Sequence, residues 1–247
     1  MIEDYINKHT IMGMLSKRYV PFDDWRGFYK NKNQTKVVVF DNDFDGNFEE
    51  IGHYYLFDKV RGYNSTLLIS NFTATFFELS GGRHREIREA RNKWDKYILI
   101  QDHPNSVLEV VELIDRWDRL SGEKYRFNRH SGYDRNFFQK YWKTEKDNLY
   151  SLFFYFGDTL VGYSVVSKIQ NDDCFRYVIR KMDISVGRNV GLYIDYKTFE
   201  NIWNERGKDF YVNWGASSGK VLKYKMKFPV FKTRKVWFGK RNKNDQQ

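Results

Sequence analysis

Hydrophobic positions change their spacing several times along this chain of 247 residues. In the first half, runs of β-branched and aromatic residues predict short strands. These strands fall at 36–40, 51–58, 66–70, 73–79 and 97–101, and the first two are joined as a hairpin by the turn at Asp43–Asn47. Residues 1–35 show no regular period and are expected to be irregular or partly helical.

Helical spacing appears between these strands. In 83–97 the apolar residues Ile87, Ala90 and Trp94 recur at intervals of three and four, which predicts a helix with a narrow buried stripe and a basic outer face. A second helix is predicted over 107–120 and a third over 134–143. The buried side of the second is expected to carry Leu108, Val111, Leu113, Ile114 and Trp117.

From residue 149 the pattern changes to three consecutive strands, at 149–156, 159–167 and 175–184, with a tight turn at Gly157-Asp158. A helix at 191–206, a strand at 210–214, a helix at 217–228 and a strand at 234–238 follow. This β-β-β-α-β-α-β order indicates a mixed α/β (α+β) fold. The organisation predicted is an N-terminal half, 1–147, and a C-terminal half, 148–247, that ends in a basic tail.

The stretch Tyr211–Pro229 is the most informative part of the chain. It predicts a strand, a break at Gly215, a helix capped by Ser217 or Ser218, and a stop at Pro229. A strand that enters a Ser/Gly turn at a helix N-terminus exposes backbone N–H groups. Such groups can hold an anion or a carbonyl oxygen, although helix capping alone also explains the serines.

Composition narrows the class of protein. Hydrophobic residues make up 41% of the chain, enough for a packed core. The single cysteine, Cys174, excludes an internal disulfide framework and a cysteine-based zinc site, and it fits a reducing, cytoplasmic setting. No window approaches the length of apolar sequence that a membrane span needs, and the histidines show no ligand spacing, so neither a membrane span nor a metal is expected.

The net charge of +10 favours a polyanionic partner such as DNA or tRNA. Arg85, Arg88 and Asn92 share one face of the predicted basic helix, and they are candidates for contact with a nucleic-acid backbone. The tail 232–243 adds three further candidates, Lys235, Lys240 and Arg241. The alternative is a solvated surface, with the helix cations paired to Glu86 and Glu89.

Four segments together resemble the GNAT acyltransferase superfamily, in particular its aminoacyl-transferring branch: the C-terminal domain of phosphatidylglycerol lysyltransferases and the Fem-type transferases. They are Leu79–Lys96, a glycine turn before an Arg-rich helix; Phe154–Ser167, a hairpin containing Leu-Val-Gly; Lys181–Gly191, a turn into a helix; and Val212–Pro229, with its Asn-Trp-Gly element. The resemblance covers roughly residues 79–238 and implies a GNAT-like fold with splayed central strands. It makes the N-terminal half a candidate for a second, degenerate GNAT-like unit.

The resemblance also implies a set of site residues. The strand 160–167 and its splayed neighbour 210–214 would form a slot lined by Val166, Ser167, Asn213 and Gly215. Asp183 would be a general base, Asn213 a catalytic contact, and Tyr224 the proton donor to the leaving group, with Tyr193 as a competing candidate for that donor. Donor-binding positions would be Arg188, Asn189, Gly191, Ser217 and Lys225, of which Arg188 and Gly191 keep only part of the acyl-CoA fingerprint Arg/Gln-x-x-Gly-x-Gly/Ala.

Two classes of function follow. The first is a transferase that moves an acyl or aminoacyl group from a CoA thioester or an aminoacyl-tRNA to an amine, with a modified DNA base of phage type as one acceptor. The second is a non-catalytic nucleic-acid-binding protein on a decayed transferase fold, which the incomplete fingerprint motivates. An ordinary turn role for Asp183, and an ordinary amphipathic helix around Tyr224, are the structural alternatives for those residues.

Overall fold

The computed structural model describes residues 11–13, 19–20, 36–40, 55–57, 66–125, 134–135, 137–141, 149–169, 174–217 and 219–241. They form a mixed α/β structure, as predicted, and the chain divides into two compact units. One unit is Asn71–Asn213, and the other combines Met1–Ser70 with Trp214–Gln247. The chain passes from one unit to the other within strands β5 (Thr66–Phe72) and β10 (Phe210–Ser217). The division into halves at residue 147 stays a prediction.

The sheet of the unit 71–213 has the order β10-β9-β8-β7-β6. Its other members are β6 (Ile98–Gln101), β7 (Leu149–Phe156), β8 (Thr159–Ile169) and β9 (Cys174–Met182). Neighbours from β6 to β9 are antiparallel, whereas β9 and β10 run parallel because helix α10 (Val190–Arg206) connects them. The predicted C-terminal order of strands and helices is therefore confirmed.

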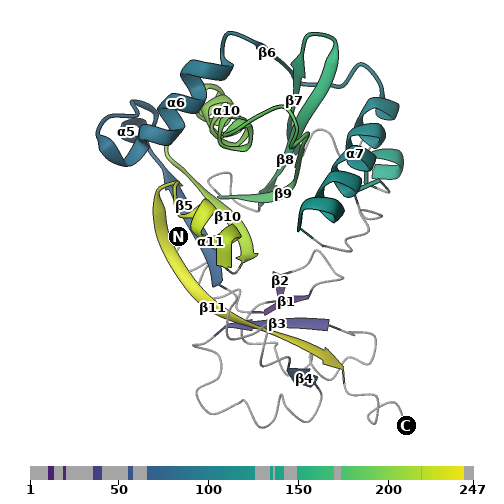
Figure 1. Cartoon of the computed structure of the whole chain (residues 1–247). Coiled ribbons are helices and arrows are strands. Elements are labelled where there is room, and N and C mark those ends of the chain that lie inside the picture. The colour runs from purple at the N-terminus through teal and green to yellow at the C-terminus, as the bar shows by residue number, and fades with distance from the viewer. Residues whose placement is uncertain are drawn as a thin grey trace. The chain divides into compact units, whose positions relative to one another are not determined.

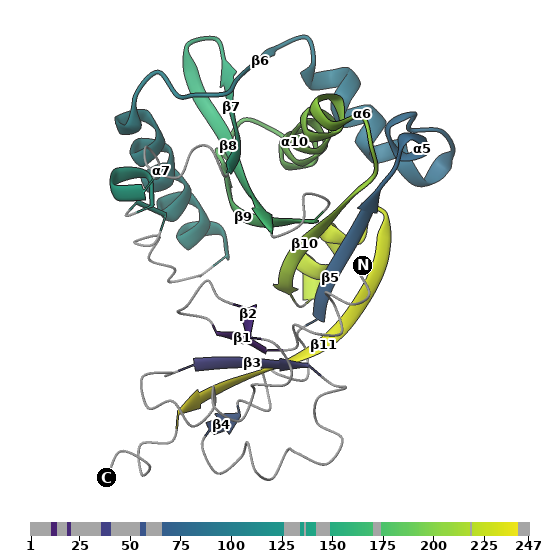
Figure 2. The ribbon, with the colours of Figure 1, turned by 180° about the vertical axis from the view of Figure 1, so that it is seen from behind.

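Helices cover both faces of this sheet (Figures 1 and 2). Helix α7 (Val107–Tyr125) lies on one face, and α10 and α6 (Arg85–Trp94) lie on the other. The narrow stripe predicted for α6 is confirmed, because Ile87, Ala90 and Trp94 are its buried residues. The prediction for Leu108 is wrong: this side chain is 66% exposed, and Val110 takes the buried place in the first turns of α7.

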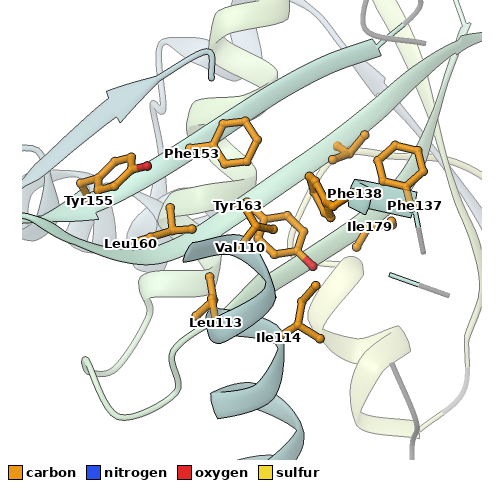
Figure 3. Close-up of a cluster of buried hydrophobic side chains, with 11 residues drawn as sticks. Val110, Leu113, Ile114, Phe137, Phe138, Phe153, Tyr155, Leu160, Tyr163 and Ile179 are labelled. Atoms are coloured by element: carbon orange, nitrogen blue, oxygen red, sulfur yellow. The ribbon is translucent and has the colours of Figure 1, made fainter. Parts of the chain in front are cut away.

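The core beneath α7 is a cluster of buried side chains (Figure 3). Strand β7 contributes the alternating residues Phe153 and Tyr155, β8 contributes three residues, and α7 contributes residues three and four positions apart. Its members are Val110, Leu113, Ile114, Phe137, Phe138, Phe153, Tyr155, Leu160, Tyr163, Val165 and Ile179. Phe137 and Phe138 belong to a short π-helical turn, η4 (Phe137–Tyr141), where a longer helix over 134–143 was predicted.

An aromatic layer holds α10 on the opposite face. The Phe72 ring lies 4.3 Å from Phe199 on α10 and 5.2 Å from Phe210 on β10, centroid to centroid. The strand predicted at 73–79 is wrong: this segment contains the one-turn helix α5 (Ala74–Phe77). Its β-branched and aromatic composition favours a strand locally, but the helical turn buries Phe76 against this layer, and packing outweighs propensity.

The other unit contains β1 (Ile11–Gly13), β2 (Tyr19–Val20), β3 (Lys36–Phe40), β4 (Tyr55–Phe57), β5, helix α11 (Gly219–Lys225) and β11 (Val230–Arg241). The predicted hairpin of 36–40 with 51–58 is wrong, because β3 pairs with β1 and β11, and β4 pairs with β11. The supposed basic tail is the long strand β11 itself, which pairs with β5 through 230–235 and with β3 through 236–240.

Candidate active site

Strand β9 lies between β8 and β10, so the predicted adjacency of 160–167 and 210–214 is wrong. Val166 and Ser167 on β8 pair with Tyr177 and Arg176 of β9. The physical reason is connection length: β8 and β9 are joined by a short antiparallel connection, and only the helical crossover through α10 can deliver a parallel strand. The parallel partner of β10 is therefore β9, and Val166 lies fully buried in the core.

The pairing of β9 with β10 is confined to one end of β9. The described pairs are Tyr211↔Cys174, Val212↔Phe175 and Asn213↔Arg176. Beyond Arg176 the segment Tyr177–Met182 continues in β9 without a described β10 pair.

A β-bulge falls at the start of this segment. Val165 pairs with Ile179 and Val166 pairs with Tyr177, so Val178 is an extra residue on β9. A bulge turns the local peptide groups away from the ladder, and bulges are common beside active sites. Side chains beyond it alternate in direction: Ile179 joins the core under α7, and Arg180 reaches α10.

The turn after β9 begins with Asp183, a buried carboxylate. Its Oδ1 accepts hydrogen bonds from Ser185 N at 2.9 Å and Ser185 Oγ at 2.5 Å, while its own N–H donates to Val161 O at 2.7 Å. Its Oδ2 lies 3.4 Å from Arg116 Nε on α7. These contacts fit a residue that shapes the turn, and the general-base role of Asp183 stays a proposal.

The donor turn predicted at 187–191 packs against α6. Trp94 Nε1 donates to Arg188 O at 3.3 Å, and the Arg188 side chain is exposed. Gly187 has φ +151°, and a Cβ atom there would lie 3.1 Å from the Trp94 ring. Asn189 has φ +67°, and its carbonyl accepts from Tyr193 N at 3.1 Å. The turn is thus held in an unusual backbone conformation by contact with a tryptophan from an earlier helix.

Gly191, which belongs to the partial acyl-CoA fingerprint, has a packing role in the structure. It is buried in the first turn of α10, and a Cβ atom there would lie 2.8 Å from Met182 Sδ. The glycine therefore allows close approach of α10 to the end of β9. Whether it also contacts a donor stays a proposal.

A charged pair that the sequence interpretation missed lies beside Gly191. Arg180 NH1 is 2.6 Å from Asp195 Oδ2 and 3.2 Å from Gly191 O, and Tyr177 OH donates to Asp195 Oδ1 at 2.5 Å. Asp195 is completely buried. A signal was present in the sequence, since Asp195 interrupts the apolar run of the 191–206 helix while β9 carries an arginine.

Tyr193, the competing candidate for the proton donor, is buried against α6. Its OH donates to Asp95 Oδ1 at 3.0 Å, and Lys197 Nζ lies 3.0 Å from the same oxygen. Burial raises the pKa of Tyr193 far above its usual value, and the Asp95 carboxylate adds to the effect. Tyr193 is therefore a neutral hydrogen-bond donor that joins α10 to the end of α6.

The remaining predicted site residues lie on β10 and α11. Asn213 is buried and ends the unit 71–213. In the other unit, β10 continues through Gly215, with φ +70°, to the buried Ser217, and α11 starts only at Gly219. The predicted strand break at Gly215 and helix start at Ser217 are therefore wrong, because the strand continues through the glycine. The alternative cap, Ser218, lies outside the described residues.

On α11, Lys225 Nζ donates to Trp214 O at 2.5 Å, which gives it a structural contact within its own unit. The Tyr224 ring lies edge-on to Phe228 with centroids 6.3 Å apart. The roles predicted for both residues stay proposals.

The basic face of α6 is partly engaged within the protein. Arg88 NH1 donates to Leu79 O at 2.8 Å and Gly81 O at 3.1 Å, while Arg85 Nε lies 2.8 Å from Glu89 Oε1. Asn92 is exposed. Lys235, Lys240 and Arg241 are on β11, but their side chains lie outside the described part. Arg88 thus organises the glycine turn before its own helix.

The described residues contain no group of three or more His, Cys, Asp or Glu side chains placed to hold a metal ion. In the same part of the chain, no helix combines the length and the apolarity needed to cross a membrane.

Comparison with solved structures identifies the fold as that of the GNAT proteins. A GCN5-related N-acetyltransferase from Kribbella flavida matches with a TM-score of 0.50 at 6% identity, covering 90% of this chain and 74% of its own. L-PGS from Bacillus licheniformis matches with a TM-score of 0.51 at 10% identity, covering 86% and 82%. A conserved protein of unknown function from Bacteroides thetaiotaomicron gives 0.60 at 15% identity, covering 90% and 75%.

No protein-family model matches the sequence, and no curated protein matches it significantly. At these identities the solved structures show a common fold and nothing finer. The predicted GNAT-like fold is confirmed.

Proposed function

We propose that this protein is an N-acyl or aminoacyl transferase. The observation that carries the proposal is the bulged end of β9, which leaves its pairing with β10 at Arg176 and leads through a tight turn into the buried helix α10. Backbone N–H groups on a bulged strand are fixed donors. They can stabilise the negative charge that develops on an acyl oxygen during transfer.

The reaction proposed is the attack of an acceptor amine on the acyl carbon of the donor. A C–N bond forms, and the C–S bond of a thioester or the C–O bond of an aminoacyl ester breaks. The acceptor nitrogen loses a proton to Asp183, and the leaving sulfur or oxygen gains a proton, a role for which Tyr224 is the candidate from the sequence. Asn213 and Gly215 would contact the donor or the acceptor on β10.

The donor is either an acyl-CoA or an aminoacyl-tRNA. Arg188 and Asn189 in the turn, with Gly191, Ser217 and Lys225, are the proposed donor contacts. Of these, the exposed Arg188 is the side chain best placed to meet a phosphate in solution. Trp94 lies directly against the same turn, so donor binding should change the environment of this indole.

The first prediction tests this function. Wild-type protein is titrated with acetyl-CoA and, separately, with charged tRNA by calorimetry, and transfer to amines is followed by mass spectrometry. Asn213→Ala and Asp183→Ala should each reduce turnover by about 100-fold or more, the range that one proton-transfer or oxyanion contact contributes. Circular dichroism checks that both variants keep the fold.

Asp158→Ala is the matched control, because this carboxylate is exposed at the turn between β7 and β8. Its turnover should equal that of the wild type. If neither donor binds at millimolar concentration, the transferase proposal is wrong. Wild-type turnover in Asn213→Ala and Asp183→Ala would instead mean that the site is misplaced.

The acceptor proposed is an amine on a nucleic acid, including a DNA base, because the net charge is +10 and all but Asn92 of the candidates on α6 and β11 are basic. The second prediction concerns this partner. Binding of duplex DNA and of tRNA should weaken with salt, with a slope of about −3 to −5 in log K against log salt for three to six phosphate contacts.

The double variant Lys235→Glu with Lys240→Glu should flatten that slope, whereas Lys208→Glu, at an exposed position after α10, should leave it unchanged. A salt-independent affinity would remove the nucleic-acid partner from the proposal. Binding without any transfer from either donor would favour the alternative, a non-catalytic nucleic-acid-binding protein.

A further inference from the structure

The buried pair of Arg180 and Asp195 lies at the point where strand β9 meets the start of α10. Asp195 has no exposed surface, and the side chain of Arg180 is only 24% exposed. Moving two charges out of water costs several kcal/mol per ion, and well-packed apolar residues often stabilise a fold equally well. A pair in this position therefore calls for a reason beyond stability.

The contacts of Arg180 show what the pair connects. One guanidinium nitrogen, NH1, bonds both to the Gly191 carbonyl in the first turn of α10 and to Asp195 one turn later. Tyr177, one residue before the bulge, donates to the second oxygen of Asp195. Tyr177 and Arg180, which lie on either side of the bulge at Val178, thus both bond to the carboxylate of Asp195.

Two glycines near this connection have side chains packed closely against them. Gly191 lies against Met182 of β9, where an added Cβ atom would come within 2.8 Å of the sulfur. Gly162 of β8 similarly faces Ile194, whose Cδ1 would lie 2.4 Å from an added Cβ. This packing sets the distance of α10 from the sheet, but apolar contacts have no preferred direction. The hydrogen bonds of Arg180 therefore fix the orientation of the first turns of α10 relative to β9.

We propose that Arg180 and Asp195 are positioning residues that hold the start of α10 and the turn 183–190 in a fixed orientation to the bulged end of β9. This inference rests on the proposed function, in which the turn binds the donor and the bulge faces the acyl oxygen. The pair keeps both elements in their donor-binding arrangement before the donor arrives. Such preorganisation lowers the ordering cost of binding.

The experiment separates positioning from stability by replacing the pair with apolar residues of similar volume. In the double variant Arg180→Met with Asp195→Leu, no buried charge is left uncompensated, so the thermal midpoint should stay within about 5 °C of the wild type. Hydrogen exchange of backbone amides in 184–194 should nevertheless become about tenfold faster. The control, Asn201→Ala with Glu205→Ala, removes an exposed bond near the other end of α10 and should change neither.

Kinetics give the second measurement. With whichever donor the wild type uses, acetyl-CoA or charged tRNA, the double variant should show a donor KM raised about tenfold or more and a kcat within about threefold. Arg180→Lys keeps the charge but has a single nitrogen in place of the planar guanidinium. Its donor KM should lie between those of the wild type and the double variant.

A double variant with wild-type exchange and wild-type KM would overturn the inference and leave the pair a stability element only. If the wild type transfers from neither donor, the proposed function fails, and the exchange measurement alone decides whether the pair positions the turn. The two failures are therefore distinguishable.

Discussion

Replacing Asp195 alone with leucine is expected to lower the free energy of unfolding by about 3–5 kcal/mol. The variant leaves the Arg180 guanidinium in a mostly buried position without its carboxylate, and it removes the acceptor of the Tyr177 hydroxyl. The attraction that offset the burial of the cation is lost, whereas the cost of taking it out of water stays. Urea denaturation followed by circular dichroism measures the change.

Comparing Asp195→Leu with the double variant separates the loss of the pair from the loss of one partner. Because Arg180→Met with Asp195→Leu removes both charges, it should recover most of the stability that Asp195→Leu loses. A matched change at an exposed pair, Asn201→Ala with Glu205→Ala, should cost less than about 0.5 kcal/mol. If Asp195→Leu were as stable as the wild type, Asp195 could not be the buried partner of Arg180.

Replacing Trp214 with alanine is expected to cost about 3–5 kcal/mol in the unit formed by 1–70 and 214–247. Trp214 is 5% exposed, and its ring lies 5.0 Å from the fully buried Phe228, centroid to centroid. Its indole N–H donates to Ser70 Oγ at 2.8 Å, and Ser70 is itself fully buried. Truncation thus creates a cavity and removes the donor to a buried hydroxyl.

Trp214→Phe is the matched variant, since it keeps a ring beside Phe228 and removes the indole N–H. It should lower the free energy of unfolding by less, about 1–3 kcal/mol, because a buried polar group loses its partner and some ring volume is lost. Urea denaturation with hydrogen exchange of β5 and β11 measures both variants. Equal stability of Trp214→Ala and wild type would show that β5, β10 and α11 are not packed as described.

Much of the fold could be predicted because local patterns agreed with the final structure. The stripe Ile87, Ala90, Trp94 placed α6 correctly, and the turn at Gly157-Asp158 placed the β7–β8 hairpin. Gly207 ends α10 in the left-handed conformation, as a helix-stopping glycine should. In each case the signal lies within a few residues of the element that it specifies.

The errors arose where distant partners decide the outcome. Segment 73–79 has strand composition, yet Phe76 is buried from a helical turn. The strand 51–58 was paired with its sequence neighbour, although β4 pairs with β11 from the far end of the chain. Within the basic stretch 232–243 a strand was predicted only at 234–238, yet β11 spans Val230–Arg241 and completes a sheet with β3 and β5.

The candidate site also has features that local sequence predicts and contacts that it does not. Asp183 and the 187–191 turn could be located from sequence, because strand, turn and helix follow one another directly. The contact of Trp94 with Arg188 joins positions 94 residues apart, and the Arg180–Asp195 bond depends on how a helix faces a strand. Neither follows from local spacing.

The sequence by itself determined the order β-β-β-α-β-α-β, the buried stripe of α6 and the place of the turn before α10, because these depend on periodicity and on neighbouring turn residues. Only the tertiary structure decided that β9 separates β8 from β10, that β9 carries a bulge at Val178, and that Arg180 reaches Asp195. The physical reason is that strand pairing and buried charge compensation depend on which distant segments meet in space. Local sequence leaves that choice open.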